Sequence, residues 1–496
     1  MLVTPMQMQA LEKFTDASGI SYGAQMDIAG RMLANVIRER YPDVTRVLLL
    51  AGPGSNGGDC YAAAYHMQQA GMRPEIVAPL GDPEIASLAE TARDRAKRCG
   101  IPIYTDAYDF ILQDIPLVVD GLFGTGFHGA LPDRVRPLLA SIKANSKRIV
   151  ACDVPSGGDA LTGLADADAL SADLTVTFGA EKLGMSQYPL RALCGEVVVA
   201  DIGIPREAFS SLPEPPAEKL SLETVKQKLP VFAPDAHKYT RGHLLAIVGC
   251  PAMRGAAVLA TEAAMRCGAG LVTCASCEPV LNAVMDRVPE VLCAPFPSDE
   301  FGDMDYTGIE AGLEGKRAVL YGCGSGTPSG IGASFFQGHA GQQDLTYILD
   351  ASGLNYLADH IEWIPKGRTI LTPHPGEAAR LLGTDVDTVQ ADRPAAARRI
   401  AEMTGTVVVL KGAGTIITDG KRTAVCCDGN NGMAKAGSGD VLAGIISALA
   451  AQGMEPYDAA CAGVMLHAAA GDLAAEELGQ RYMLPQDLIA ALQEVL

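Results

Sequence analysis

The chain has 496 residues, of which 48% are hydrophobic and 20% are charged, and its formal net charge at pH 7 is −19. This length exceeds one ordinary domain and allows two or three hydrophobic cores. The acidity argues against nucleic acid or an anionic membrane surface as the main partner, because both carry negative charge. A phosphate-bearing ligand must therefore be held by local hydrogen-bond donors.

The N-terminus and the cysteines indicate where the protein works. The stretch MLVTPMQMQALEKFTDASG lacks the basic start and apolar core of a signal peptide. The longest apolar run, near 441–451, is too short to span a bilayer. We expect the 13 cysteines to be reduced core thiols, including Cys274 and Cys277, which form a CxxC pair. These features predict a cytoplasmic protein with no membrane partner.

Residues 1–40 are predicted to form amphipathic helices, and short apolar runs then alternate with helical patterns. Near-continuous apolar strands are typical of a parallel sheet that helices cover on both faces. The apolar runs of the first half are RVLLLA (46–51), EIVAP (75–79), PLVVD (116–120), RIVAC (148–152), LTVTF (174–178) and EVVVA (196–200). They predict an α/β domain over residues 1–212 with a Rossmann-like, doubly wound parallel sheet.

A proline-rich, polar segment over 213–235 is the expected linker. The alternation of strands and helices then restarts, and three helical patterns at 438–452, 456–477 and 485–495 close the chain. The apolar runs of this half are 243–248, 271–275, 317–321, 345–350, 368–372 and 406–411. We therefore expect a second α/β domain over residues 236–496.

The first strand of the first domain runs into a glycine-rich loop, GPGSNGGD (52–59), and then into a helix. Such a turn offers backbone N–H groups to a phosphate. The glycine spacing matches GxGxxG, which alone is a weak indication. The alternative is a plain glycine turn in which Asp59 caps the helix.

Two more polar, glycine-flanked turns follow strands of this domain, at Asp120–Gly126 and at Asp153–Gly157. The carboxyl ends of parallel strands meet at one edge of the sheet, where open α/β sheets bind ligands. Asn56, Asp120 and Ser156 offer only oxygen ligands, which suit a hard cation better than zinc. Each of them alone is also compatible with an ordinary turn residue.

The stretch around which the second domain is organised is GNNGMAKAGSGDVL (429–442), which passes directly into an apolar helical pattern. The N-terminus of a helix presents free N–H groups and partial positive charge, so it forms an anion hole. A carboxylate there repels phosphate, so Asp440 fits better as a base that takes a proton from a hydroxyl beside the phosphate. The alternative is that Asp440 is an N-cap and that Gly437 and Gly439 only form the turn.

Other polar turns also follow strands of the second domain. His374 lies between two prolines after the strand at 368–372, and Lys411–Thr415 follows the strand at 406–410. Lys411 and the backbone after it are suited to hold a nucleotide phosphate or ribose, and a β-hairpin turn is the alternative. Together with the anion hole, these turns predict a ribokinase-like domain. ATP or ADP would lie across its sheet, with Asp440 directed at a substrate hydroxyl.

The motifs of the first domain, with TVTFGAEKLG at 175–184, resemble the N-terminal domain of the YjeF family, the NAD(P)HX epimerase. The resemblance implies a K⁺ ion held by Asn56, Asp120 and Ser156. It implies substrate binding by Ser55, Asn56, Gly57, Gly58, Asp59, Gly124, Thr125, Gly126, Phe127, His128, Gly129, Ala130 and Asp153. Asp153 is the candidate acid/base, and Lys182 is a second candidate. Ser55 and Cys60 stand where the family usually has Asn and Gly.

The motifs HKYTRG (237–242), LTPHPGE (371–377), VVVLKGAGT (407–415) and GSGDVLAGII (437–446) resemble the C-terminal domain of the same family, the ADP/ATP-dependent NAD(P)HX dehydratase. The resemblance implies that ADP or ATP, with Mg²⁺, is bound by Lys411, Gly412, Ala413, Gly414, Thr415 and Gly439. It implies substrate binding by Ala257, Gly324, Gly326, His374 and Asp440, with Asp440 catalytic. The sequence departs from the family pattern at Ser352, Asn431 and Lys435.

The two resemblances imply one repair pathway. Hydrated NADH or NADPH (NADHX or NADPHX) carries a hydroxyl at C6 of the reduced ring, as two epimers. The first domain is expected to interconvert the epimers and the second to remove water from one of them. Family resemblance also implies a homo-oligomer. Two other interpretations are a ribokinase-type small-molecule kinase with a Rossmann-like accessory domain, and a nucleotide sensor without catalytic activity.

Overall fold

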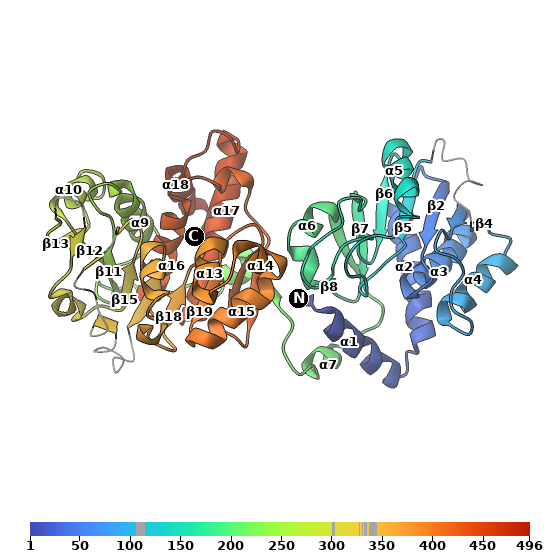
Figure 1. Cartoon of the computed structure of the whole chain (residues 1–496), viewed down its shortest axis with the longest axis horizontal. Helices are drawn as coiled ribbons and strands as arrows, with labels where there is room; N and C mark the ends of the chain where they lie inside the picture. Colours follow the sequence, from blue (N-terminus) through green and yellow to red (C-terminus); the bar gives the residue numbers. More distant parts are fainter. Residues whose placement is uncertain (106–114, 300–302, 327, 330, 332–334, 337–344) are drawn as a thin grey trace. The chain divides into compact units, whose positions relative to one another are not determined.

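The computed structural model describes residues 1–105, 115–299, 303–326, 328–329, 331, 335–336 and 345–496 (Figure 1). The chain forms two compact units, Met1–Ala217 and Glu218–Leu496. The division falls inside the expected linker, which itself contains β10 (Glu218–Lys219) and α8 (Leu222–Lys226). Among the described residues, no helix has both the length and the apolarity needed to cross a bilayer.

The first unit is built on a parallel sheet of seven strands in the order β4-β3-β2-β5-β6-β7-β9. The strands and helices of this unit are β1 (Leu2–Val3), α1 (Pro5–Ala17), α2 (Tyr22–Arg40), β2 (Arg46–Ala51), α3 (Ser55–Gln69), β3 (Arg73–Val77), α4 (Leu88–Arg98), β4 (Ile103–Tyr104), β5 (Val118–Gly121), α5 (Arg136–Asn145), β6 (Ile149–Cys152), β7 (Leu174–Phe178), β8 (Glu181–Lys182), the 3₁₀ helix η2 (Leu183–Ser186), α6 (Leu190–Leu193), β9 (Glu196–Ala200) and α7 (Arg206–Ser210). The strand order reverses direction at β2, as it does in a doubly wound sheet.

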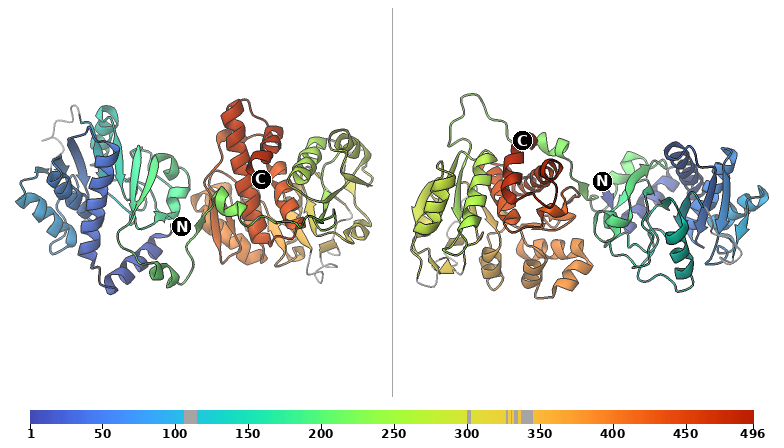
Figure 2. Two further views of the ribbon diagram at one scale, coloured as in Figure 1. Left: turned by 180° about the vertical axis from the view of Figure 1, so that it is seen from behind. Right: turned by 90° about the horizontal axis from the view of Figure 1, so that it is seen from above.

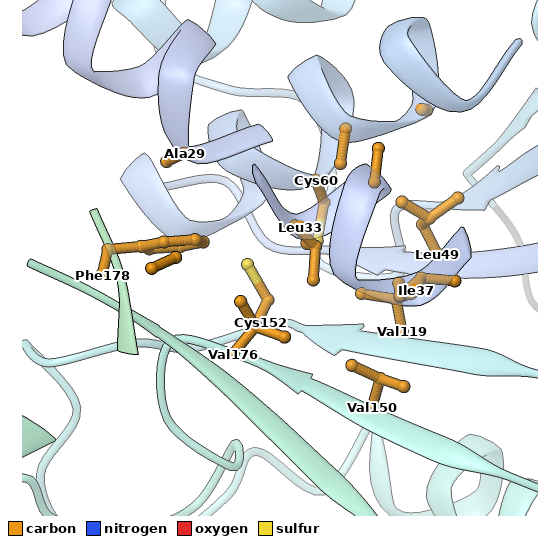
Figure 3. Close-up of a cluster of buried hydrophobic side chains, with 14 of the residues drawn as sticks. Ala29, Leu33, Ile37, Leu49, Cys60, Val119, Val150, Cys152, Val176 and Phe178 are labelled. Carbon is orange, nitrogen blue, oxygen red and sulfur yellow. The ribbon is translucent and has the colours of Figure 1, made fainter. Parts of the chain in front are cut away.

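Helices cover both faces of this sheet, because alternate residues of each strand point to opposite sides. On one face, Leu49 of β2 and Val150 of β6 are buried with Leu33 of α2, and Figure 3 shows this cluster. On the other face, Leu48 of β2 is buried with Leu139 of α5. The doubly wound architecture expected from the continuous apolar strands is therefore confirmed.

The second unit is built on a sheet of ten strands in the order β10-β21-β20-β19-β18-β17-β15-β11-β12-β13. From β19 to β13 the strands are parallel, whereas β20 is antiparallel to both its neighbours. The elements of this unit that follow α8 are β11 (His243–Ile247), α9 (Arg254–Arg266), β12 (Leu271–Ser276), α10 (Glu278–Arg287), β13 (Leu292–Pro295), β14 (Met304–Asp305), η3 (Ile309–Leu313), β15 (Ala318–Tyr321), β16 (Pro328–Ser329), β17 (Thr346–Leu349), α12 (Ser352–Leu357), η4 (Ile361–Trp363), β18 (Thr369–Leu371), α13 (Pro375–Leu382), α14 (Val386–Ala391), α15 (Arg393–Thr404), β19 (Val407–Leu410), β20 (Thr415–Thr418), β21 (Thr423–Cys426), η5 (Asn431–Met433), α16 (Ser438–Ala451), α17 (Pro456–Leu478) and α18 (Pro485–Val495).

The apolar helix α16 is the central helix of the second unit. It packs against α9 and α17, and it also contacts β15 and β17 (Figures 1 and 2). All its residues from Val441 to Ala451 are buried. A helix that is apolar on every side is expected to be surrounded by protein. This burial fixes the position of its N-terminus, where Asp440 lies.

Candidate active sites

A cavity of about 760 Å³ lies at the carboxyl ends of the strands in the first unit. Its walls include most of the residues that the sequence predicted for this site: Ser55, Asn56, Asp59, Gly124, Thr125, Gly126, Phe127, His128, Ala130, Asp153 and Lys182. Gly57, Gly58 and Gly129 are not among the lining residues. A Cβ on Gly57 would lie 1.8 Å from the backbone oxygen of Gly52, so this glycine lets the loop fold tightly.

Asp153 has a strained backbone conformation, and several hydrogen bonds hold its side chain in this cavity. Its φ is 66°, a left-handed conformation that costs free energy for a non-glycine residue. Its Oδ1 accepts hydrogen bonds from Thr177 Oγ1 (3.0 Å), from Phe178 N (3.1 Å) and from Lys182 Nζ. Lys182 is only 1% exposed and also donates to Thr177 Oγ1 at 2.8 Å. The two candidate acid/base residues therefore form one ion pair.

Two further carboxyl groups face the same cavity. Burial and the charges of Asp153 and Glu12 raise the pKa of Asp59 well above its ordinary value, although Lys182 opposes the shift. Burial and the charge of Asp153 also raise the pKa of Glu12, again opposed by Lys182. Glu12 lies on α1, outside every motif singled out in the sequence, and nothing in its local pattern indicated a role.

Two of the three residues expected to hold a cation, Asn56 and Ser156, contact the backbone of Phe123, and the third, Asp120, contacts Ser156. Asn56 Nδ2 donates to Phe123 O at 2.7 Å, and Ser156 Oγ accepts from Phe123 N at 2.9 Å. Asp120 accepts from Ser156 N at 2.9 Å, and burial raises the pKa of Asp120. Asn56 Oδ1 is buried and has no hydrogen-bond partner among the residues that the structure describes. An unpaired buried oxygen beside a buried carboxylate fits a hard cation.

The second candidate site lies at the N-terminus of α16. Gly437 is the N-cap with φ 99°, and Asp440 lies in the first turn of the helix. Burial and the charge of Asp350 raise the pKa of Asp440 to about 6, while Cys323 and Lys411 oppose the shift. The sulfur of Cys323 and the carboxylates of Asp350 and Asp440 lie within 4.8 Å of one another. A carboxyl group with this pKa is ionised at neutral pH and can act as a base.

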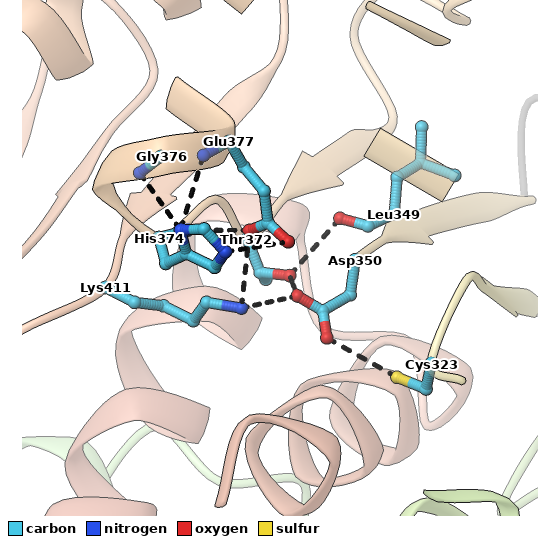
Figure 4. A network of polar contacts seen from close by, with 8 residues as sticks. All are labelled: Cys323, Leu349, Asp350, Thr372, His374, Gly376, Glu377 and Lys411. Carbon is cyan, nitrogen blue, oxygen red and sulfur yellow. Dashed lines mark hydrogen bonds and ion pairs between the residues drawn. The ribbon is translucent and has the colours of Figure 1, made fainter. Parts of the chain in front are cut away.

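Asp350 lies within 4.8 Å of Asp440. It also contacts the predicted nucleotide-binding loop through Lys411, as Figure 4 shows. It accepts from Lys411 Nζ at 2.6 Å and from Thr372 Oγ1 at 2.7 Å, and Cys323 Sγ lies 3.5 Å from its other oxygen. Burial lowers the pKa of Lys411, but the charges of Asp350 and Glu377 outweigh it, so this pKa is raised overall. Lys411 Nζ also lies 3.6 Å from where a Cβ on Gly439 would stand. Lys411 is thus a fixed cation beside the helix N-terminus.

His374 is the N-cap of α13, so it has a structural role in addition to its predicted role in the site. Its Nδ1 accepts from Gly376 N at 3.0 Å and from Glu377 N at 3.3 Å (Figure 4). Because Nδ1 accepts, the neutral ring carries its proton on Nε2. The side chain of His374 remains 57% exposed to solvent. The sequence predicted a site role for His374 and did not anticipate the cap.

The remaining predicted residues of this site lie on neighbouring turns. Gly324 and Gly326 both have positive φ, and a Cβ on Gly324 would lie 2.7 Å from Ala256 Cβ at the start of α9. Ala257, one residue further along α9, is fully buried. The strands β19 and β20 form an antiparallel hairpin. The turn of this hairpin is made of Lys411, Gly412, Ala413 and Gly414, and β20 starts at Thr415. The hairpin and a nucleotide-binding role are therefore not exclusive.

Asp350 and Arg393 are two residues of this site that sequence reasoning missed. Asp350 directly follows the apolar strand β17, so the same strand-end rule that selected His374 could have found it. Arg393 begins α15 and donates from Nη2 to Leu410 O at 3.3 Å and to Lys411 O at 3.2 Å. It holds the start of the turn that the sequence predicts to bind the nucleotide. No local motif marks Arg393, because its role depends on contacts across the fold.

Comparison with known proteins places both units in one family. The chain matches two protein families. One, described as NAD(P)H-hydrate dehydratase, matches residues 244–494. The other, described as YjeF-related protein N-terminus, matches residues 23–184. The bifunctional NAD(P)H-hydrate repair enzyme of Coxiella burnetii is 35% identical over 98% of this chain and 97% of its own length. This chain belongs to the family of bifunctional NAD(P)H-hydrate repair enzymes.

Other relatives of this repair enzyme agree with that placement. The bifunctional NAD(P)H-hydrate repair enzyme of Escherichia coli is 33% identical over 97% of this chain and 91% of its own length. Among solved structures, the ADP/ATP-dependent NAD(P)H-hydrate dehydratase of Bacillus subtilis, co-crystallised with ATP and Mg²⁺, is 29% identical. The alignment covers 56% of this chain and 97% of the Bacillus subtilis chain, with a TM-score of 0.45. The two bifunctional relatives and the two family matches confirm the expected repair enzyme, with an epimerase and a dehydratase domain, at the level of the family.

Proposed function

We propose that the first unit interconverts the R and S epimers of NADHX and NADPHX at Asp153, and that the second unit dehydrates the S epimer at Asp440 with ADP or ATP. The observation that supports the second assignment is the position of Asp440. It lies in the first turn of α16, with the Lys411 cation and the Asp350 carboxylate beside it. An anion hole, a fixed cation and a base are the groups that phosphoryl transfer to a hydroxyl requires.

In the proposed dehydration, the Asp440 carboxylate takes the proton of the C6 hydroxyl while the oxygen attacks the terminal phosphorus of the nucleotide. The bond from that phosphorus to the bridging oxygen breaks, and C6 carries a phosphate ester. The ring nitrogen then supplies an electron pair, phosphate leaves with the C6–O electrons, and loss of a C5 proton restores the C5–C6 double bond. The backbone N–H groups at the start of α16 and Lys411 would hold the phosphates. Mg²⁺, held by the phosphates and a neighbouring carboxylate, would supply charge neutralisation.

The test is to add S-NADHX and ATP, or ADP, to the purified protein and to follow the return of NADH absorbance. Asp440→Asn is expected to lower the dehydration rate about 10²–10⁴-fold, since it removes the base. Its epimerase activity is the internal control for protein concentration and for the integrity of the first unit. Phosphorus NMR of the same mixture distinguishes the rival kinase function, which would accumulate a phosphorylated product in place of free phosphate and NADH. Unchanged dehydration by the variant would contradict the role of Asp440.

We also propose that K⁺ binds beside the epimerase cavity, with Asn56, Asp120 and Ser156 as ligands. The unpaired buried Asn56 Oδ1 and the buried Asp120 carboxylate support this site. The chemistry that K⁺ would supply is a positive charge that orders the 120–126 turn. Epimerisation should therefore rise with K⁺, and Asn56→Ala should remove that dependence. Asn145→Ala, which changes an exposed asparagine of α5, should keep the K⁺ dependence of the parent.

Assembly as a homo-oligomer and a location in the cytoplasm complete the proposal. The likeness to the repair-enzyme family supports the first, and the reduced, mostly buried cysteines are compatible with the second. Light scattering coupled to size-exclusion chromatography tests the assembly state. A mass equal to that of one 51.7 kDa chain would contradict it.

A further inference from the structure

Glu12 is the charged residue of the epimerase cavity that comes from outside the recognised motifs. It lies on α1, whereas the match to the epimerase family begins at residue 23. Its side chain lines the same cavity as Asp59, Asp153 and Lys182. Within the described residues, no side-chain group donates a hydrogen bond to its carboxyl. Glu12 is therefore free to interact with a ligand in that cavity.

The backbone of Glu12 is fixed from the neighbouring helix. Gln25 of α2 is 4% exposed, and its Nε2 donates to Glu12 O at 3.1 Å and to Ile20 O at 2.9 Å. Gln25 also lines the cavity, and its buried Oε1 has no hydrogen-bond partner in the described part of the chain. This clamp holds α1 so that Glu12 stays at the cavity wall. Such a fixed position suits a group that must meet a reacting atom.

The ionic surroundings of Glu12 differ from those of Asp153. The Asp153 carboxylate accepts a hydrogen bond from the Lys182 ammonium and forms an ion pair with it. Glu12 faces two other acids, Asp59 and Asp153, and Lys182 is the cation that acts on it. Burial and Asp153 raise the pKa of Glu12, which favours its protonated form. One cavity thus holds a carboxylate that is ion-paired with Lys182 and, at Glu12, a carboxyl group that accepts no side-chain hydrogen bond from the described residues.

We infer that Glu12 is a second catalytic residue of the epimerase, which donates a proton to the ring nitrogen while Asp153 takes the proton of the C6 hydroxyl. This inference rests on the proposed epimerase role of the first unit. The C6–N1 bond breaks, its electrons pass to N1, and the C6–O electrons form an aldehyde. Rotation about C5–C6 exposes the other face of the aldehyde. N1 then attacks C6, returns its proton to Glu12, and the C6 oxygen takes a proton from Asp153.

This route balances without any further reactant, and the oxygen stays bonded to C6 throughout. A route through loss of hydroxide would create an iminium ion, and loss of a C5 proton from that ion would yield NAD(P)H directly. An epimerase that avoids the iminium ion leaves dehydration to the second unit. Opening the ring requires an acid at nitrogen as well as a base at oxygen, and Glu12 and Asp153 supply the two.

The test compares Glu12→Gln with the parent in the full chain, starting from R-NADHX without nucleotide, so that the dehydratase is silent. The chromatographic rate of S-epimer formation should fall about 10²–10⁴-fold in kcat, with little change in KM. Dehydration of S-NADHX with ATP should be unchanged, which shows that the second unit is intact, and the unchanged KM shows that the first unit still binds its substrate. Glu39→Gln removes the same charge from an exposed position on α2 and should epimerise like the parent.

The pH profile separates proton donation from a structural role. In the parent, kcat should fall as pH rises past the point where Glu12 loses its proton, and Glu12→Gln should lose this alkaline limb. Glu12→Asp should restore part of the rate and keep the limb. The inference is overturned if Glu12→Gln stays within about twofold of the parent, if only KM changes, or if Asp59→Asn rather than Glu12→Gln removes the limb. Failure of the parent itself to epimerise would instead contradict the proposed function.

Discussion

Asp440 lies beside Asp350, and we expect the protonation of Asp440 to control the second site. Asp440 must be ionised to act as a base, yet burial and the neighbouring Asp350 charge raise its pKa to about 6. Lys411 and Thr372 hold Asp350 in place, so its negative charge is fixed. Dehydration should therefore fall as pH drops through about 6, because Asp440 becomes protonated. The measurement is kcat/KM for S-NADHX between mildly acidic and neutral pH.

Removing the charge of Asp350 tests the cause of this pH dependence. In Asp350→Asn, the Coulombic contribution that raises the pKa of Asp440 is lost, so the acid limb should move to lower pH. The maximal rate should also fall, because Lys411 loses its 2.6 Å partner. Asp359→Asn, at an exposed position, should leave the limb in place. A limb that does not move in Asp350→Asn would mean that another group sets it.

At the scale of elements, both sites depend on turns that bring strand ends close together. Gly322 ends β15 with φ 121°, and a Cβ there would lie 1.9 Å from the backbone oxygen of Asp350. Gly308 also has a positive φ, of 86°, but a Cβ on it would meet nothing within 4 Å. Gly308→Ala should therefore cost only the left-handed strain, about 1–2 kcal/mol. Gly322→Ala should cost about 1–3 kcal/mol more, because the backbone of Asp350 must move.

The measurement for this pair is the dehydratase activity that survives graded heating, with surviving epimerase activity as the reference within each sample. Gly322→Ala should lose dehydratase at a lower temperature than Gly308→Ala, and epimerase should be equal in both. Equal dehydratase losses in the two variants would show that the close approach at Gly322 carries no cost.

The same elements show what the sequence could and could not predict. Apolar strands and the glycine-rich turns after them were visible in the sequence, because strand ends and helix starts are encoded locally. Asn56, Asp153 and Asp440 could be found for that reason. Glu12 and Arg393 could not, because α1 and α15 reach their sites through packing between distant segments. The cap made by His374 was likewise unexpected, since Ser, Thr, Asp and Asn are the usual side chains at this position.

At the scale of the whole molecule, each unit contains the full set of residues that its proposed reaction uses. Glu12, Asp59, Asp153 and Lys182 all belong to Met1–Ala217, and Asp350, Lys411 and Asp440 all belong to Glu218–Leu496. The epimer made by the first unit therefore has no need to remain on the same chain. Released S-NADHX should reach the second unit of any chain through solution.

A mixture of two full-length variants tests this independence. Asp153→Asn should lose epimerisation but dehydrate S-NADHX, and Asp440→Asn should do the reverse. With R-NADHX and ATP, each variant alone should form NADH no faster than spontaneous epimerisation and dehydration allow. The equimolar mixture should restore NADH formation, with a lag that shortens as the Asp440→Asn concentration rises, because more S epimer is released per unit time. If the mixture stays at the background rate while both single activities persist, the S epimer passes between the two units of one chain without release.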